Sequence, residues 1–183
     1  MLIQTLCAFL LAAVPDGRAP LHPTDARAIR AALQSSERIL DDRIQQMTAR
    51  APFVLLGTTR GAYLAGYGAV FTAEVNLAPA ANLSPFRPAY SPKELQDLNR
   101  QKREKLGALR TGLRQLLVEQ AASLSHLAPH EKIAIVVTLF NFRWEDTSNL
   151  PSQLVLQATR QSLLDARQAG PEALDKAIEI REF

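Results

Sequence analysis

Apolar residues recur every three or four positions in two long parts of the chain, and this period predicts helices. Between residues 24 and 50 the spacing predicts an amphipathic helix with Thr24 as its N-cap. A second, longer helix is predicted over residues 92–128, because Ser91 can cap it and Glu94 completes a capping box. The leucines of this longer helix fall on one side of its helical wheel, and its arginines fall on a flank.

Other segments alternate between apolar and polar residues, and this period of two predicts strands. Residues 70–77 and residues 153–159 both alternate in this way, so each should turn one face to the core. Residues 133–142 are apolar on both faces, which predicts a strand at the centre of the sheet. Residues 53–56 have strand character, and residues 57–61 are predicted to turn.

The end of the chain alternates between short predicted elements. Residues 161–168 are predicted to be helical, Pro171 starts a second short helix after Gly170, and residues 177–183 finish as a strand. The order of elements indicates an α+β fold. We expect a mostly antiparallel sheet of about four or five strands, with the long amphipathic helix and an N-terminal helix packed on one side. Residues 24–183 are predicted to form a single domain.

The first 14 residues are dominated by apolar side chains and carry no charged side chain. A run of this length is shorter than the ~20 residues that span a membrane, and it is typical of a secretory signal peptide. Residues 15–23 contain three prolines and are predicted to be a linker. We therefore expect a periplasmic or secreted product. The alternative is that residues 1–14 form a core element of a cytoplasmic protein.

Net charge, the cysteine count and histidine spacing limit which partners and cofactors are expected. The formal net charge of +3 permits contact with an anionic ligand, but no nucleic-acid motif accompanies it, so no specific nucleic-acid binding is expected. Cys7 is the only cysteine and falls within the predicted signal peptide. His126 and His130 are four residues apart, but Pro129 lies between them and no third ligand has suitable spacing. We expect no metal, no cofactor and no transmembrane span.

Two segments are candidate binding sites. Tyr63 and Tyr67 lie in the glycine-rich segment 61–68, where they could line the rim of a ligand site; the alternative is that the glycines only allow a bend or bulge. The second segment follows the predicted central strand, and an aromatic ring beside charges there suits recognition of a sugar, a peptide or a partner. Its residues are Arg143, Trp144, Glu145 and Asp146. The alternative is an ordinary loop whose Trp144 covers the edge of the core.

A row of arginines on the flank of the long helix is a third candidate. Arg100, Arg103 and Arg110 could hold an anionic ligand or an acidic protein surface. The alternative is a solvated helix flank, which commonly carries such charges.

The sequence contains no motif of nucleophilic catalysis. We therefore expect a non-enzymatic ligand- or partner-binding module of the cell envelope. One alternative is a small hydrolase or lyase that uses carboxylate and histidine groups near the end of the sheet, drawn from Glu74, Glu145, Asp146 and His130. A second alternative is a cytoplasmic scaffold or oligomerisation domain.

Overall fold

A computed structural model describes residues 23–47, 53–79 and 90–183 of the chain. The helices are α1 (Pro23–Met47), α2 (Pro92–Ser123), α3 (Arg160–Ala169) and α4 (Pro171–Ala177). The strands are β1 (Val54–Leu64), β2 (Gly68–Asn76), β3 (Lys132–Leu139), β4 (Gln153–Thr159) and β5 (Glu179–Glu182). The predicted signal peptide, residues 1–14, and residues 15–22 of the predicted linker lie outside the described residues.

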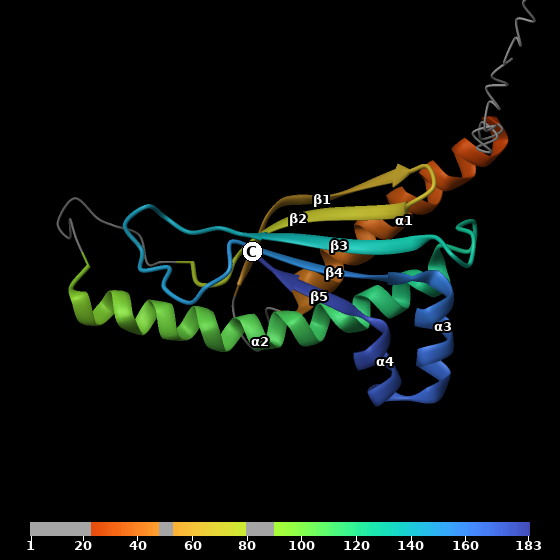
Figure 1. Cartoon of the computed structure of the whole chain (residues 1–183). Helices are drawn as coiled ribbons and strands as arrows, with labels where there is room; N and C mark the ends of the chain where they lie inside the picture. The colour runs from red at the N-terminus through yellow and green to blue at the C-terminus, as the bar shows by residue number, and fades with distance from the viewer. Residues whose placement is uncertain (1–22, 48–52, 80–89) are drawn as a thin grey trace, which may run out of the picture.

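The five strands form one sheet in the order β1-β2-β3-β4-β5 (Figure 1). Neighbouring strands are antiparallel except β2 and β3, which are parallel. This exception follows from the long helix, because α2 connects β2 to β3 and a parallel pair requires such a crossover. The expected α+β fold with a mostly antiparallel sheet is confirmed, and β3 is the central strand as predicted.

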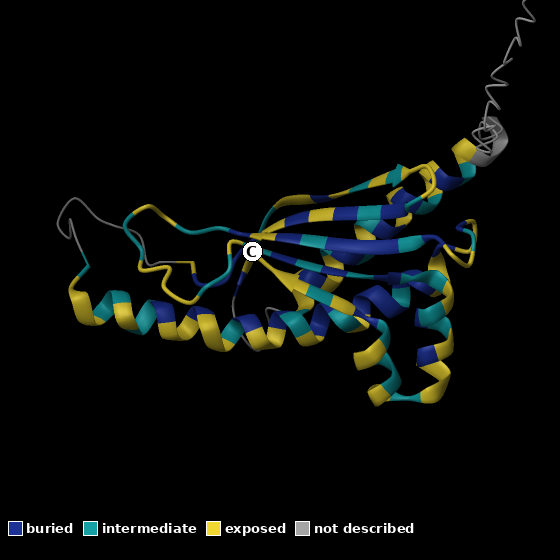
Figure 2. Ribbon diagram, in the orientation of Figure 1, coloured by how far each residue is buried: buried dark blue, intermediate teal, exposed yellow. Residues whose placement is uncertain are grey.

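The core lies between the sheet and the helices (Figures 1 and 2). Burial alternates along β2 and β4, so one face of the sheet packs against helices and the other is more exposed. Phe71, Ile135 and Leu156 are buried on the covered face and contribute to one continuous cluster. Thr72 and Glu74 are exposed on the other face.

The turn predicted at residues 57–61 is wrong. β1 runs without interruption from Val54 to Leu64, and its register against β2 shifts between Leu56 and Arg60. Gly57 has a φ of 77°, which glycine adopts readily and other residues rarely do. The apparent turn signal therefore marks a β-bulge inside a longer strand.

The predicted helix boundaries differ from the structure by a few residues. The start of α2 is as predicted, because Ser91 and Glu94 form a reciprocal capping box and Pro92 is the first helical residue. The helix ends at Ser123 instead of near residue 128. α1 is described from Pro23 to Met47, and the last three residues of its predicted range, 48–50, lie outside the described residues. None of the described helices is both long enough and apolar enough to cross a membrane.

The first half of α2 extends past the end of the sheet (Figure 1). The segment between β3 and β4 lies over this part of the helix, and it contains the predicted site residues 143–146.

Candidate functional site

Trp144 is packed between two other aromatic rings. Its ring centroid lies 4.8 Å from that of Tyr90 and 5.2 Å from that of Phe142, and both pairs are stacked. Phe140 then meets Phe142 edge to face at 4.8 Å. Both faces of the Trp144 ring are therefore used in stacking contacts within the same chain.

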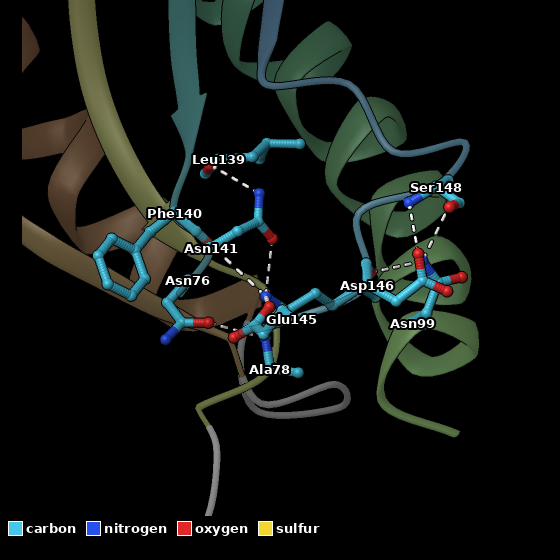
Figure 3. A network of polar contacts seen from close by, with 10 residues as sticks. Asn76, Ala78, Asn99, Leu139, Phe140, Asn141, Glu145, Asp146 and Ser148 are labelled. Carbon is cyan, nitrogen blue, oxygen red and sulfur yellow. Dashed lines mark hydrogen bonds and ion pairs between the residues drawn. The ribbon is translucent and has the colours of Figure 1, made fainter. Parts of the chain in front are cut away.

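Glu145 is buried and forms an ion pair with Lys102 of α2; the side chains are 1% and 2% exposed (Figure 3). The Lys102 ammonium also donates to Asn141 Oδ1 at 2.8 Å and to the Phe140 carbonyl at 3.4 Å. All three ammonium protons therefore have an acceptor. The second carboxylate oxygen of Glu145 is buried without a hydrogen-bond partner.

The same loop is held to α2 by Asn99. Its side-chain amide donates to the carbonyls of Asp146 at 2.8 Å and Ser148 at 3.1 Å (Figure 3). Hydrogen bonds from Ser148 hold the pKa of the Asp146 carboxyl below its usual range. Burial and the neighbouring Lys102 charge lower the pKa of the Lys105 ammonium. Of the four predicted loop residues, only Arg143 remains exposed without an assigned role.

Tyr63 and Tyr67 do not share a rim, because their hydroxyls lie on opposite faces of the sheet. The Tyr63 hydroxyl donates to Glu131 at 2.6 Å, and this hydrogen bond with burial raises its pKa to about 12. The Tyr67 hydroxyl donates at 2.6 Å to Gln157, which alternates with core residues of β4 and so faces away from the helices. Burial is the main cause that raises the pKa of Tyr67.

Each arginine of the predicted row lies near a carboxylate of this chain. Arg100 pairs with Asp97 at 2.7 Å, and Arg110 pairs with Glu182 of β5. Arg103 lies close enough to Asp146 for its charge to lower the pKa of that carboxyl. The row is therefore largely used within the molecule, and the pair made by Arg110 joins β5 to α2.

The residues proposed for acid–base chemistry are not assembled into one site. His130 precedes β3 and Glu145 follows it, so the length of this eight-residue strand, roughly 26 Å, separates them. Glu74 lies on the exposed face of the sheet, whereas Glu145 is buried against α2. A general base must lie within about 3 Å of the proton that it removes. In the described part of the chain, no group of three or more metal-ligating side chains occurs.

A groove between α1 and β1 is a further candidate site, and we call it the α1–β1 groove. It consists of two hollows of about 510 Å³ and 310 Å³ that share Gln34, Glu37 and Arg60. Figure 1 shows α1 crossing behind the sheet close to β1. The residues that line the larger hollow are Ala26, Ile29, Arg30, Leu33, Gln34, Glu37, Arg60, Gly61, Ala62 and Tyr63. Its volume is in the range of sites that hold small ligands or peptide segments.

Two carboxylates of α1 hold β1 in place along this groove. Glu37 accepts from the Gly61 amide, and Asp41 accepts from the Thr59 amide, each at 2.7 Å. These amides point outward from β1, which is an edge strand, so the helix satisfies donors that would otherwise be unpaired. Thr59 itself is 2% exposed, and its hydroxyl has no hydrogen-bond partner.

Tyr63, which was predicted to line a ligand rim with Tyr67, lines this groove instead, and the arginines of the groove were not predicted. Arg30, Arg38 and Arg60 line the two hollows, and Arg60 also lines a third hollow of about 500 Å³ on the exposed face of the sheet. The sequence alone does not show that these arginines lie around one groove, because that depends on α1 packing against β1. The sequence offered a weaker signal, because Glu37 and Asp41 are four apart and share a face of α1.

Comparisons with known proteins supply no relative. No family model matches the chain, and neither a curated protein nor a solved structure matches it.

Proposed function

We propose that this chain is a non-enzymatic binding module of the cell envelope that holds part of a partner, or an anionic ligand, in the α1–β1 groove. The observation that carries the proposal is the groove itself, which combines a partly apolar wall with arginines at its rim. Binding sites commonly pair an apolar lining with a few polar groups that orient the ligand. The proposed location rests on the apolar run of residues 1–14.

The arrangement of the other sites supports binding in this groove over the alternatives. The aromatic loop and the arginine row of α2 make their main contacts within the molecule. The groups considered for hydrolysis lie at opposite ends or faces of the sheet. The α1–β1 groove is a concave surface whose arginines pair with no carboxylate among the described residues.

Photocrosslinking from within the groove tests the proposal. Gln34 lines both hollows, and Gln46 is an equally exposed glutamine of α1 that lines neither. A photoreactive residue at position 34 should capture a partner in envelope extract, and one at position 46 should not. Mass spectrometry then identifies the captured protein or ligand, which is purified and titrated against the protein.

Quantitative binding decides the outcome. Gln34→Trp fills the groove and should weaken binding of the purified partner about tenfold or more, a cost of about 1.4 kcal/mol. Gln46→Trp makes the same chemical change outside the groove and should leave the dissociation constant within about twofold. Equal capture from both positions, or equal affinity of both tryptophan variants, would show that the groove is not the binding site.

A further inference from the structure

Three arginines around the α1–β1 groove make no ion pair within the described residues. They are Arg30 and Arg38 on α1 and Arg60 on β1, and all three are exposed. The arginines of α2 differ, because Arg110 and Arg114 are both ion-paired with carboxylates of the C-terminal elements. The unpaired charges of the groove are therefore positive.

The two acidic groups in the groove already have partners. Glu37 and Asp41 each accept a backbone N–H at 2.7 Å, so these donors offset part of their charge. An occupant thus meets three guanidinium groups that have no ion-pair partner among the described residues. Carboxylates are the groups that guanidinium binds in matching geometry.

The spacing of the arginines indicates an extended occupant. Arg30 and Arg38 are eight residues apart, which is roughly 12 Å along a helix. Four residues of an extended peptide span about 13 Å. Arg60 lines both hollows from β1 at the edge of the sheet, so anionic groups spread along this edge could reach all three arginines.

Part of the wall between the arginines is apolar, and polar side chains make up the rest. Ile29, Leu33 and Tyr63 line the larger hollow, and Ile29 and Leu33 are each 8% exposed. An extended peptide turns alternate side chains to opposite sides, so it can offer apolar groups to this wall and carboxylates to the rim. A polyphosphate or a sulfated sugar chain carries the charge but not the apolar groups.

We propose that the occupant of the α1–β1 groove is an extended acidic peptide segment of a partner protein, held by Arg30, Arg38 and Arg60. Its apolar side chains pack on Ile29 and Leu33. This inference rests on the proposed function and names the chemistry of the partner.

Titration with a defined peptide tests this inference. The probe is a fluorescein-labelled, end-blocked hexapeptide of alternating glutamate and valine, and the matched peptide has lysine in place of glutamate. Fluorescence anisotropy should show saturable binding of the glutamate peptide that weakens as salt rises, and no binding of the lysine peptide. Inorganic polyphosphate is the competitor that represents the other class of polyanion.

Two protein variants locate the binding. The triple variant Arg30→Gln/Arg38→Gln/Arg60→Gln should weaken binding of the glutamate peptide about tenfold or more, because each substitution removes one charge contact. The matched variant Arg100→Gln/Arg103→Gln removes two exposed arginines of α2 and should change the affinity less than about twofold. Circular dichroism confirms that both variants are folded.

The outcomes separate this inference from the proposed function. Equal affinity of the wild-type protein and the triple variant overturns the inference, as does binding of polyphosphate without binding of the peptide. If crosslinking from position 34 still captures a partner in that case, the groove remains the binding site and only its acidic peptide is wrong. If position 34 captures nothing specific and the peptide fails to bind, both proposals fall.

Discussion

Lys102 and Glu145 form the most deeply buried ion pair among the described residues, because both side chains are almost completely buried. This pair should therefore affect stability more than the exposed ion pairs do. Taking two charges out of water costs several kcal/mol for each ion, and mutual attraction with additional hydrogen bonds compensates for it. Lys102 has three acceptors, whereas one oxygen of Glu145 has no donor. Removing one member of the pair should therefore lower the free energy of unfolding far more than replacing both members with apolar residues.

Glu145→Ala should lower the free energy of unfolding by about 3–5 kcal/mol, because it leaves the Lys102 ammonium buried without its counter-ion. The double variant Lys102→Met/Glu145→Leu should recover most of this loss, since apolar side chains of similar size replace both charges. Urea unfolding measures all three proteins. Glu104→Ala, an exposed substitution on the same helix, is the control and should stay within about 0.5 kcal/mol of wild type. A single and a double variant of equal stability would contradict this account.

Tyr63 makes stability depend on pH at the alkaline end. Its folded-state pKa is raised from 10.0 to about 12, mainly by the hydrogen bond that it donates to Glu131. As the pH rises above 10, the unfolded chain loses this proton before the folded chain does. The stabilisation is therefore present in full below pH 10 and is lost as the pH approaches about 12.

The stability difference between wild type and Tyr63→Phe should shrink between pH 10 and about 12. Below pH 10 the difference should be about 1 kcal/mol, a modest value because the phenol is only partly buried and solvent screens it. Urea midpoints of both proteins at several pH values measure this difference. If the stability difference between the two proteins stays constant from pH 9 to about 12, the pKa of Tyr63 is not raised in the folded protein.

At the scale of elements, α2 combines two packing environments in one helix. Its second half packs in the core, and Gly112 lies against Met47 of α1, where a Cβ atom would meet the thioether. Gly107, only five residues earlier, has open space where its Cβ would stand. The packing around these two glycines therefore differs, although each weakens the helix by about 1 kcal/mol relative to alanine.

Gly107→Ala should raise the free energy of unfolding by up to about 1 kcal/mol, because helix propensity improves and nothing is displaced. Gly112→Ala should gain less than this or destabilise the protein, because the Met47 side chain must move. Thermal unfolding of the two variants under identical conditions gives the comparison. A Gly112→Ala variant that is as stable as Gly107→Ala would show that α1 and α2 do not pack closely here.

At the scale of the whole molecule, the sheet has two edges, β1 and β5. β5 is only four residues long and carries charged side chains, which makes it a poor template for another strand. β1 is eleven residues long, and α1 protects it by accepting the outward amides of Thr59 and Gly61. The carboxylates of Glu37 and Asp41 should therefore hinder association of two copies of the chain through β1.

Glu37→Ala/Asp41→Ala should promote self-association, because it leaves the two outward amides of β1 free to pair with another chain. Each lost hydrogen bond should also lower the free energy of unfolding by about 1–3 kcal/mol. Sedimentation velocity at matched concentrations compares this variant with wild type and with Glu37→Gln/Asp41→Asn, which keeps oxygen acceptors. Identical sedimentation of all three proteins would mean that the carboxylates do not guard the edge.

The fold was largely predictable, but the candidate site was not. Helix spacing, the capping box at Ser91 and the uniformly apolar central strand are local signals, and they gave the α+β class correctly. The segment 57–61 misled because glycines mark a bulge as readily as a turn. Tyr63 was identified as a site residue without the helix that completes its groove.

Most helices and strands could be predicted from the sequence, because periodicity and capping act over a few neighbouring residues. Which charged groups meet depends on the tertiary fold. Glu37 accepts from Gly61 across 24 residues, and Lys102 pairs with Glu145 across 43, so no local pattern could assign these partners. Long-range contacts likewise pair Arg110 and Arg114 with carboxylates of the C-terminal elements, and they leave Arg30, Arg38 and Arg60 around the groove without an ion pair among the described residues.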